Sequence, residues 1–135
     1  MTNEDEILDS AITLVEATLD LPILDQHKRD VINVMLWKIT EASGKYKTRF
    51  RSTGAANAPK DTKLQHEHVI PRKTLIDAIL KEPSRARELL TSALACTVTK
   101  EEHDRLTRIT REQPDLQGWE RYTAAGITIV DTHKT

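Results

Sequence analysis

Side chains that can bind metals or carry protons gather at the end of one short β-like run in this sequence. The run lies in segment 64–73, LQHEHVIPRK, and its polar members are His66, Glu67 and His68. Because proline has no amide hydrogen to donate to a strand ladder, Pro71 predicts that the strand ends close to these side chains. This pattern favours a functional site at the end of the strand.

A second segment, 96–103, reads CTVTKEEH and predicts a short strand followed by a helix. Thr99 is suited to the N-cap of that helix, and Glu102 stands at its third position, which together form a capping box. The helix should end before Pro114, because proline disrupts a helix interior. His103 would lie in its first turn, so we expect it to meet the end of the strand in segment 64–73.

Two amphipathic helices are predicted before these segments. Apolar residues recur at three- and four-residue steps over 3–19, with Thr2 or Asn3 as the N-cap. A second apolar pattern covers 25–42, and Gly44 is suited to its C-terminal cap. The apolar face of 25–42 is broad. We therefore expect this helix to be central, or to contact a protein partner or a second copy of the chain.

A basic stretch follows the two helices. Residues 45–52 alternate basic with apolar or hydroxyl-bearing side chains, which predicts a strand with four charges on one face. These charges are Lys45, Lys47, Arg49 and Arg51. Such a face suits contacts with phosphates, and it is also a common guard on an exposed sheet edge. Segment 52–61 contains glycine, proline and small residues and is predicted to be a flexible loop.

Shorter elements complete the expected fold. Short helices are predicted to begin near Thr74 and Pro83, and another should contain Trp119 and Tyr122. The apolar run 127–130 predicts a final strand. These elements indicate an α+β fold that is mainly helical.

Length and composition indicate one domain. The chain has 135 residues, of which 38% are hydrophobic and 30% charged, and this is typical of a globular domain. Its expected parts are N-terminal helices over 1–44, a basic strand and loop over 45–63, a core over 64–110 and a C-terminal extension over 111–135.

No apolar run is long enough to span a membrane, and the acidic N-terminus is unlike a signal peptide, so a cytoplasmic location is expected. The chain has one cysteine, Cys96, which excludes an internal disulfide and a Cys-x-x-Cys zinc site. We expect Cys96 to be a small buried apolar residue.

Charge is distributed unevenly along the chain. Residues 1–43 contain nine acidic and three basic residues, for a net charge of −6, whereas residues 44–135 contain twelve acidic and seventeen basic residues, for +5. A basic part of this size favours a polyanionic partner, of which nucleic acid is the most common.

The order of strand, His/Glu-rich turn, inserted helices, strand and helix over 64–110 resembles the HNH endonucleases of the ββα-metal superfamily. The resemblance is carried by Glu67-His68-Val69-Ile70-Pro71 and by His103, and it covers about a third of the chain. This chain lacks the Cys-x-x-Cys zinc ligands that brace many members. The resemblance implies a ββα-metal core and an enzyme that hydrolyses phosphodiester bonds in DNA.

The resemblance also implies roles for individual residues. Glu67 and His103 would hold a divalent ion such as Mg, Mn, Ni or Zn, with His66 as an outer contributor. His68 would be the general base that activates water, because a neutral imidazole can accept a proton near neutral pH. A single ion with open positions suffices to bind the scissile phosphate.

A straight strand would favour a different centre. Side chains alternate along a strand, so His66 and His68 would share one face while Glu67 points to the other. The site would then consist of His66, His68 and His103 around zinc or nickel. The end of the strand decides between the two arrangements.

Other basic residues are candidates for contact with phosphates beside the site. They are Arg72, Lys73 and Arg105, although Arg105 could equally form a helix-surface ion pair. His27 and His133 have no partners nearby in the sequence and are expected at the surface. Two other functions stay open: a catalytically inactive nucleic-acid-binding or regulatory protein, and a protein-interaction module that uses the acidic N-terminal helices.

Overall fold

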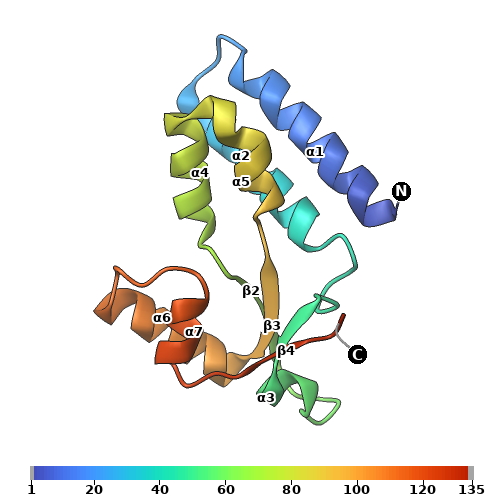
Figure 1. Ribbon diagram of the computed structural model, residues 1–135, viewed down its shortest axis with the longest axis vertical. Coiled ribbons are helices and arrows are strands. Elements are labelled where there is room, and N and C mark those ends of the chain that lie inside the picture. The colour runs from blue at the N-terminus through green and yellow to red at the C-terminus, as the bar shows by residue number, and fades with distance from the viewer. Residues whose placement is uncertain (1, 134–135) are drawn as a thin grey trace. The chain divides into compact units, whose positions relative to one another are not determined.

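The computed structural model describes residues 2–133 and has the expected α+β fold, mainly helical with one small sheet (Figure 1). Contacts divide the chain into two compact units. The helical unit comprises Met1–Ser43 and Ile70–Leu94, and the sheet unit comprises Gly44–Val69 and Ala95–Thr135. Each unit has its own hydrophobic core, so each is described separately.

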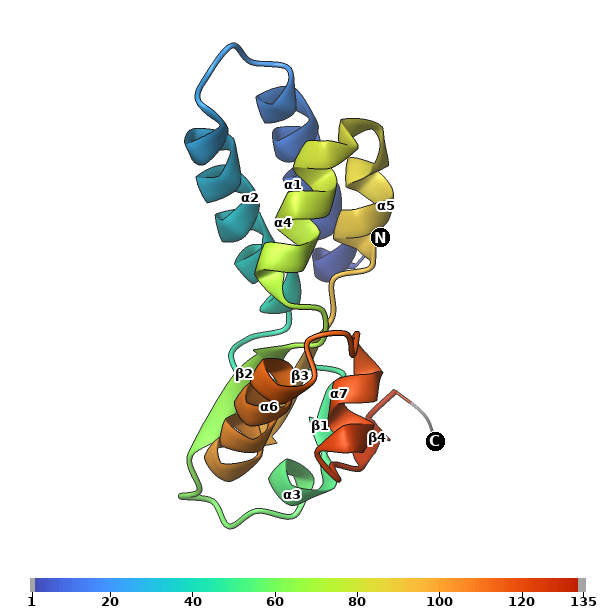
Figure 2. The same cartoon turned by 90° about the vertical axis from the view of Figure 1, so that its left-hand side faces the viewer.

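The helical unit contains four α-helices and a short 3₁₀ turn. They are α1 (Asn3–Leu19), α2 (Asp25–Thr40), α4 (Arg72–Lys81), η1 (Pro83–Arg85) and α5 (Ala86–Thr91). Helix α1 packs against α2 and α5, and α4 packs against α2 and α5, so the four helices form a bundle (Figures 1 and 2). Its centre is apolar and includes Ile12, Ile32, Leu36, Ile79 and Leu90, all nearly inaccessible to solvent.

The ends of these helices follow the local sequence. Helix α1 begins after Thr2, whose hydroxyl accepts from the amide of Asp5, while the Asp5 carboxylate accepts from the amide of Thr2. Helix α2 ends at Thr40 with Glu41 as its C-cap, so Gly44, with φ +107°, lies in the following turn. Helix α2 therefore ends two residues earlier than predicted.

Helix α4 begins earlier than predicted. It starts at Arg72, immediately after Pro71, and the amides of Thr74 and Leu75 donate to the Pro71 carbonyl. Thr74 is therefore inside the helix and is not its cap. The break expected at Pro83 is confirmed, because Pro83 starts η1 and α5 follows directly.

The sheet unit is built on four strands: β1 (Phe50–Ser52), β2 (Leu64–His68), β3 (Ala95–Thr99) and β4 (Ile129–Asp131). Their order in the sheet is β2-β3-β1-β4. Strands β2 and β3 are antiparallel, β3 and β1 are parallel, and β1 and β4 are antiparallel.

Three helices complete the sheet unit: α3 (Thr53–Ala56), α6 (Lys100–Glu112) and α7 (Trp119–Ala124). Helix α6 packs on β2 and β3, and α7 packs beside α6 (Figure 2). The core beneath them consists of Val69, Cys96, Val98, Leu106, Tyr122 and Ile127. Cys96 is fully buried in this core, as its apolar role predicted.

The basic stretch 45–52 is not the single strand that alternation predicts. Its only strand residues are those of β1, and Lys47 donates its amide to the Gly44 carbonyl in a turn. Tyr46 has φ +61°, a left-handed conformation that interrupts an extended chain. The four basic side chains therefore do not share one strand face. The loop predicted over 52–61 contains helix α3, which is capped by Ser52.

Within residues 2–133, every helix is too short or too polar to cross a lipid bilayer.

Candidate active site

The candidate site lies where helix α6 begins on the antiparallel pair β2 and β3. The Thr99 hydroxyl accepts from the amide of Glu102, and the Glu102 carboxylate accepts from the amide of Thr99, which confirms the predicted capping box. Because this box fixes the first turn of α6 at the end of β3, His103 is directed towards the neighbouring strand β2. The residue that it meets there is Glu67.

Glu67 and His103 are in direct contact. His103 Nδ1 lies 2.6 Å from Glu67 Oε2, and the two side chains are 38% and 15% exposed respectively. A carboxylate at this distance fixes the orientation of an imidazole. The opposite ring nitrogen, Nε2, can then accept a proton or bind a metal ion. This pair is the chemically competent part of the site.

Arg121 of helix α7 supports the Glu67 end of the pair. Its side chain is only 3% exposed, and its Nη2 donates to the main-chain carbonyls of His68 and Val69. Its Nη1 donates to Thr110 Oγ1 and lies 3.8 Å from Glu67 Oε1. The guanidinium therefore holds the end of strand β2 and provides positive charge beside the Glu67 carboxylate. Because these partners are distant in sequence, no local motif identifies Arg121.

A second buried carboxylate holds the start of helix α6. Glu102 is 6% exposed, and its Oε1 accepts a hydrogen bond from Ser52 Oγ at 2.5 Å in addition to the Thr99 amide. Ser52 Oγ also accepts from the Ala55 amide as the N-cap of α3. Gly54 leaves room for this arrangement, since a Cβ there would lie 2.8 Å from Glu102 Oε2. Glu102 is therefore a structural residue.

Two other reactive side chains beneath the site are neutral. Burial, followed by the negative charges of Glu102 and Glu67, raises the pKa of the Cys96 thiol to about 12. Burial likewise raises the pKa of Tyr122 well above that of an ordinary tyrosine. Because a thiol is nucleophilic only as the thiolate, Cys96 is not suited to be a nucleophile at neutral pH. Glu67 and His103 are therefore left as the candidates for chemistry at this site.

His66 and His68 lie on the other face of strand β2. The strand pairs with β3 residue by residue through His68, opposite Ala95, so its side chains alternate without a break. The two imidazole rings are 5.0 Å apart and tilted by 70°. Since Glu67 contacts His103 on the α6 face, His66 and His68 point away from that contact.

The strand thus runs straight through His68, and the break on which the joint use of Glu67 and His68 depended is absent. The three-histidine arrangement expected for a straight strand is not formed either, because His103 lies with Glu67 on the opposite face. In the described part of the chain, residues 2–133, no group of three or more His, Cys, Asp or Glu side chains converges as a metal site would require. The two potential ligands that do lie together are the Glu67 carboxylate and the His103 imidazole, which are in hydrogen-bond contact. Ligands of one ion at about 2.0–2.2 Å and a right angle lie about 3 Å apart, slightly more than the 2.6 Å of this contact.

Three of the four basic side chains of segment 45–52 contact other groups of the sheet unit. Arg49 forms a bidentate ion pair with Asp131, with both N–O distances at 2.9 Å. Its guanidinium also stacks on the Phe50 ring. Arg51 donates to the Tyr46 carbonyl. Lys45 lies over the Tyr46 ring, and the Lys47 residue is exposed.

The remaining basic candidates for phosphate contact are divided between the two units. Arg72 and Lys73 are part of the helical unit, where Arg72 donates to Asn33 and stacks on Trp37, and Lys73 pairs with Asp77. Arg105 lies on α6 and donates to the Ala125 carbonyl. His27 and His133 are exposed, as expected.

The arrangement as a whole offers one exposed imidazole, one half-buried carboxylate and a buried arginine that holds the strand between them. Such a group can bind a cation, move a proton, or do both beside a bound anion. Comparisons with protein-family models, curated proteins and solved structures found no match to this chain, so the contacts of Glu67, His103 and Arg121 are the basis for assigning a function.

Proposed function

We propose that the protein is a metal-dependent nuclease of HNH type that hydrolyses phosphodiester bonds in DNA. The observation that carries the proposal is the 2.6 Å contact between His103 Nδ1 and Glu67 Oε2 at the junction of an antiparallel strand pair and the helix that follows it. This is the order of elements and residue types that a ββα-metal site uses. The net charge of the sheet unit, +3 from twelve Lys/Arg and nine Asp/Glu, also suits a polyanionic substrate.

Glu67 and His103 would be the protein ligands of one divalent ion. The bound ion would bind the scissile phosphate, stabilise its growing charge and lower the pKa of the attacking water. Glu67 and His103 would fix the position of the ion, and Arg121 would hold strand β2, which carries Glu67, in place. Two protein ligands leave the remaining coordination positions open for substrate and water.

The general base is not assigned to His68. The unbroken alternation of β2 directs His68 to the face opposite Glu67, and its side chain is only 7% exposed. In a mechanism without a metal ion, which is the alternative to metal binding by this pair, Nε2 of His103 would accept the proton from water, with Nδ1–H donated to Glu67. In that arrangement Glu67 orients the imidazole.

A plasmid-nicking assay in Mg, Mn, Ni and Zn, with EDTA as the metal-free condition, tests the proposal. Glu67→Gln and His103→Ala should each reduce nicking by about 10²- to 10⁴-fold, the usual range for a lost acid–base or metal-binding group. His27→Ala, a change to an exposed histidine of the helical unit, is the matched control and should retain full activity. Wild-type nicking by purified His103→Ala would refute the mechanism.

Two further comparisons refine the mechanism. Activity that persists in EDTA but is lost in His103→Ala would indicate acid–base catalysis by Glu67 and His103 alone. His68→Ala should keep measurable activity if its position on the opposite face is decisive. Complete loss of activity in a folded His68→Ala protein would restore it as the base.

A second candidate function is protein association through the helical unit. Large apolar residues are exposed on its first two helices, including Leu14 of α1 at 46% and Val34 of α2 at 48%. They line neighbouring hollows that share Ile7 and Lys38. Equilibrium sedimentation of the wild type and of a Leu14→Glu, Val34→Glu variant tests this candidate. A dimer that the double substitution dissociates would support it.

A further inference from the structure

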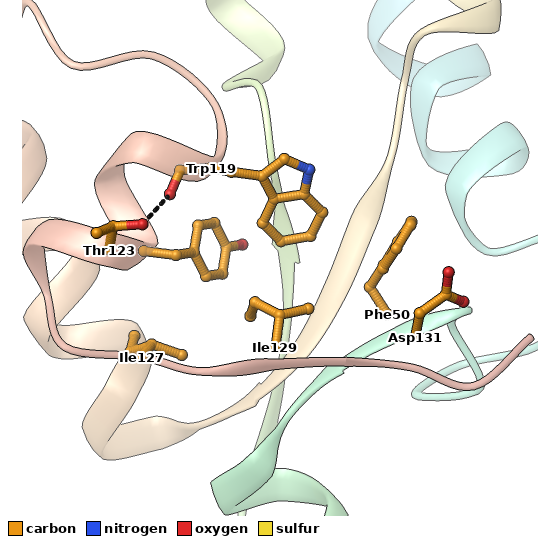
Figure 3. Close-up of a pocket in the computed structure, with 7 residues that line it drawn as sticks. Phe50, Trp119, Thr123, Ile127, Ile129 and Asp131 are labelled. Atoms are coloured by element: carbon orange, nitrogen blue, oxygen red, sulfur yellow. Dashed lines mark hydrogen bonds between the residues drawn. The ribbon is translucent and has the colours of Figure 1, made fainter. Parts of the chain in front are cut away.

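An open hollow lies on the sheet unit between helix α7 and strands β1 and β4. Its volume is about 330 Å³, and it is lined mainly by aromatic and branched aliphatic side chains (Figure 3). The residues that line it are Phe50, Trp119, Tyr122, Thr123, Ile127, Ile129 and Asp131. A concave apolar site with few polar groups is the usual form of a binding site for a small organic group.

The aromatic residues suit a flat ligand. The Trp119 ring lies 5.1 Å from that of Phe50, tilted by 68°, and 5.0 Å from that of Tyr122, tilted by 60°. In Figure 3 the Trp119 ring lies above Ile129, with Phe50 to the right and Ile127 to the left. Tyr122 is buried, whereas Trp119 and Phe50 are only partly buried, so Trp119 can present an aromatic surface to a ligand.

The hollow is on the same face of the sheet as the Glu67–His103 pair. The strand register aligns Glu67 with Cys96, Cys96 with Phe50, and Phe50 with Asp131 in one row across the sheet. Because neighbouring strands are about 4.8 Å apart, Glu67 and Phe50 are separated by about 10 Å along this row. Tyr122 links the two regions, since it lines the hollow and packs in the same core as Cys96, the β3 partner of Glu67.

An ion pair between Arg49 and Asp131 stands at the rim of the hollow. Arg49 stacks on Phe50 with its guanidinium 5.0 Å from the ring centre and is held there by its ion pair with Asp131. The Arg49 side chain is still 47% exposed. Asp131 balances the charge of this guanidinium, so a phosphate would contact it through the exposed part of the side chain while the attached base enters the aromatic hollow.

We propose that this hollow binds one unstacked nucleobase of the strand whose phosphate lies at Glu67 and His103, with Trp119 as the stacking surface. The inference rests on the proposed nuclease function and specifies its substrate as a strand with an accessible base near the scissile bond. Stacking on an aromatic ring accepts any base, so the hollow contributes affinity and position and little sequence preference.

Tryptophan fluorescence provides a test that does not depend on cleavage. The chain has two tryptophans, so a Trp37→Phe variant keeps Trp119 as the only reporter. This variant is titrated in EDTA with a single-stranded oligodeoxyadenylate, and with an abasic deoxyribose-phosphate strand of equal length. The base-containing strand should quench Trp119, and the abasic strand should bind about tenfold more weakly without quenching.

Two substitutions at Trp119 control for folding. Trp119→Phe keeps an aromatic ring and should bind the oligodeoxyadenylate nearly as well as wild type, whereas Trp119→Leu keeps the apolar contact but should bind about tenfold more weakly. Fluorescence anisotropy of a labelled strand measures both, and circular dichroism verifies their folding. Equal binding by the two variants, or equal quenching by the abasic strand, would overturn the proposal.

The nicking assay separates this proposal from the nuclease function. Metal-dependent nicking without base-dependent quenching would leave the nuclease function standing and refute the base-binding hollow. Base-dependent quenching in a protein that cuts no DNA would support the hollow and refute the catalytic role of Glu67 and His103.

Discussion

The two units differ in what they bury. The core of the helical unit is apolar, and Thr18 is its one buried polar residue within residues 2–133. The sheet unit buries six: Thr48, Ser52, His68, Thr97, Glu102 and Arg121. Burying a polar or charged group is costly unless its hydrogen bonds are satisfied. The stability of the sheet unit therefore depends on satisfying the hydrogen bonds of these buried polar groups, a requirement that the helical unit hardly has. The buried polar groups lie around Glu67 and His103.

The two units also differ in net charge. The helical unit has eight basic and twelve acidic residues, for −4, and the sheet unit has +3. The acidic and basic parts expected from the sequence thus belong largely to different compact units. One unit has a conventional apolar core, and the other combines a small core with a polar network and a basic surface. If the contrast extends to stability, substitutions in the polar network of the sheet unit should lower the unfolding free energy more than matched substitutions in the helical unit.

The largest effect is expected at Arg121. Arg121→Met keeps the approximate volume but leaves the carbonyls of His68 and Val69 and the Glu67 carboxylate without a guanidinium, so unfolding free energy should fall by about 3–5 kcal/mol. The matched change in the helical unit, Leu36→Met, should cost less than about 1.5 kcal/mol, because it conserves volume in an apolar core. Urea denaturation followed by tryptophan fluorescence compares them. Similar costs would remove the contrast between the units.

The two capping boxes provide a closer comparison. Glu102→Ala should lower the unfolding free energy by about 2–3 kcal/mol, since a buried charged acceptor of two hydrogen bonds is lost. Asp5→Ala removes the equivalent residue of α1, which is exposed, and should have a clearly smaller effect. Thermal unfolding of both variants measures the difference. A larger loss for Asp5 would mean that burial is not what makes the Glu102 box important.

The exposed box should also depend on pH in a defined direction. Hydrogen bonds from Thr2 lower the pKa of Asp5. Whatever stability this carboxylate adds is present above its unfolded-state pKa and is lost as the pH falls through its folded-state pKa. The difference in melting temperature between wild type and Asp5→Ala should therefore shrink in acid, and an increase there would contradict the assignment.

A smaller effect is expected at Gly54, with a sign that is diagnostic. Alanine usually stabilises a helix relative to glycine, but a Cβ at Gly54 would lie 2.8 Å from Glu102 Oε2 and 3.1 Å from its Cδ. Gly54→Ala should therefore destabilise the protein by about 1–2 kcal/mol. In a Glu102→Ala background the same change should become neutral or stabilising, and urea denaturation of the double-mutant cycle measures this coupling. Additive effects would exclude the contact as the cause.

Cys96 should report opening of the sheet unit without altering stability. The thiol is fully buried and its pKa is raised to about 12, so it should resist alkylation by iodoacetamide at pH values near 8 in the folded protein. Labelling should begin only at urea concentrations that unfold the sheet unit. In a Trp119→Phe background, Trp37 fluorescence follows the helical unit, so the two midpoints show whether the units unfold together. Rapid labelling without urea would refute the burial argument.

Local patterns predicted most of the secondary structure. Helix α1 has the expected bounds, and the Thr99 box marked the start of α6, because caps and amphipathic stripes depend on neighbouring residues alone. The failure in 45–52 has a similarly local cause. Alternation there suits a strand, but Tyr46 adopts φ +61° and the chain turns. An alternating pattern of side chains does not show that a single residue, here Tyr46, has a left-handed backbone conformation.

The candidate site was predictable only in part. The pairing of Glu67 with His103 could be expected from the resemblance, since it requires only that the strand and the helix meet. The role of Arg121 could not, because its partners are main-chain carbonyls 52 and 53 residues away. The Arg49–Asp131 pair, separated by 82 residues, is another example. Such contacts depend on the sheet order, and no short pattern in the sequence encodes it.

The insertion of residues 70–94 between strands β2 and β3 has a consequence for the order of folding. His68 pairs with Ala95, so the register next to the site can close only after 26 intervening residues have been made by the ribosome and brought together. Those residues complete the bundle with α1 and α2, whose mutual contacts are local and form quickly. A nascent chain would thus have its first helices early and gain the Glu67–His103 pair late, after α6 has emerged. Such an order would leave the Glu67–His103 contact unformed until residues 95–103 have joined the sheet.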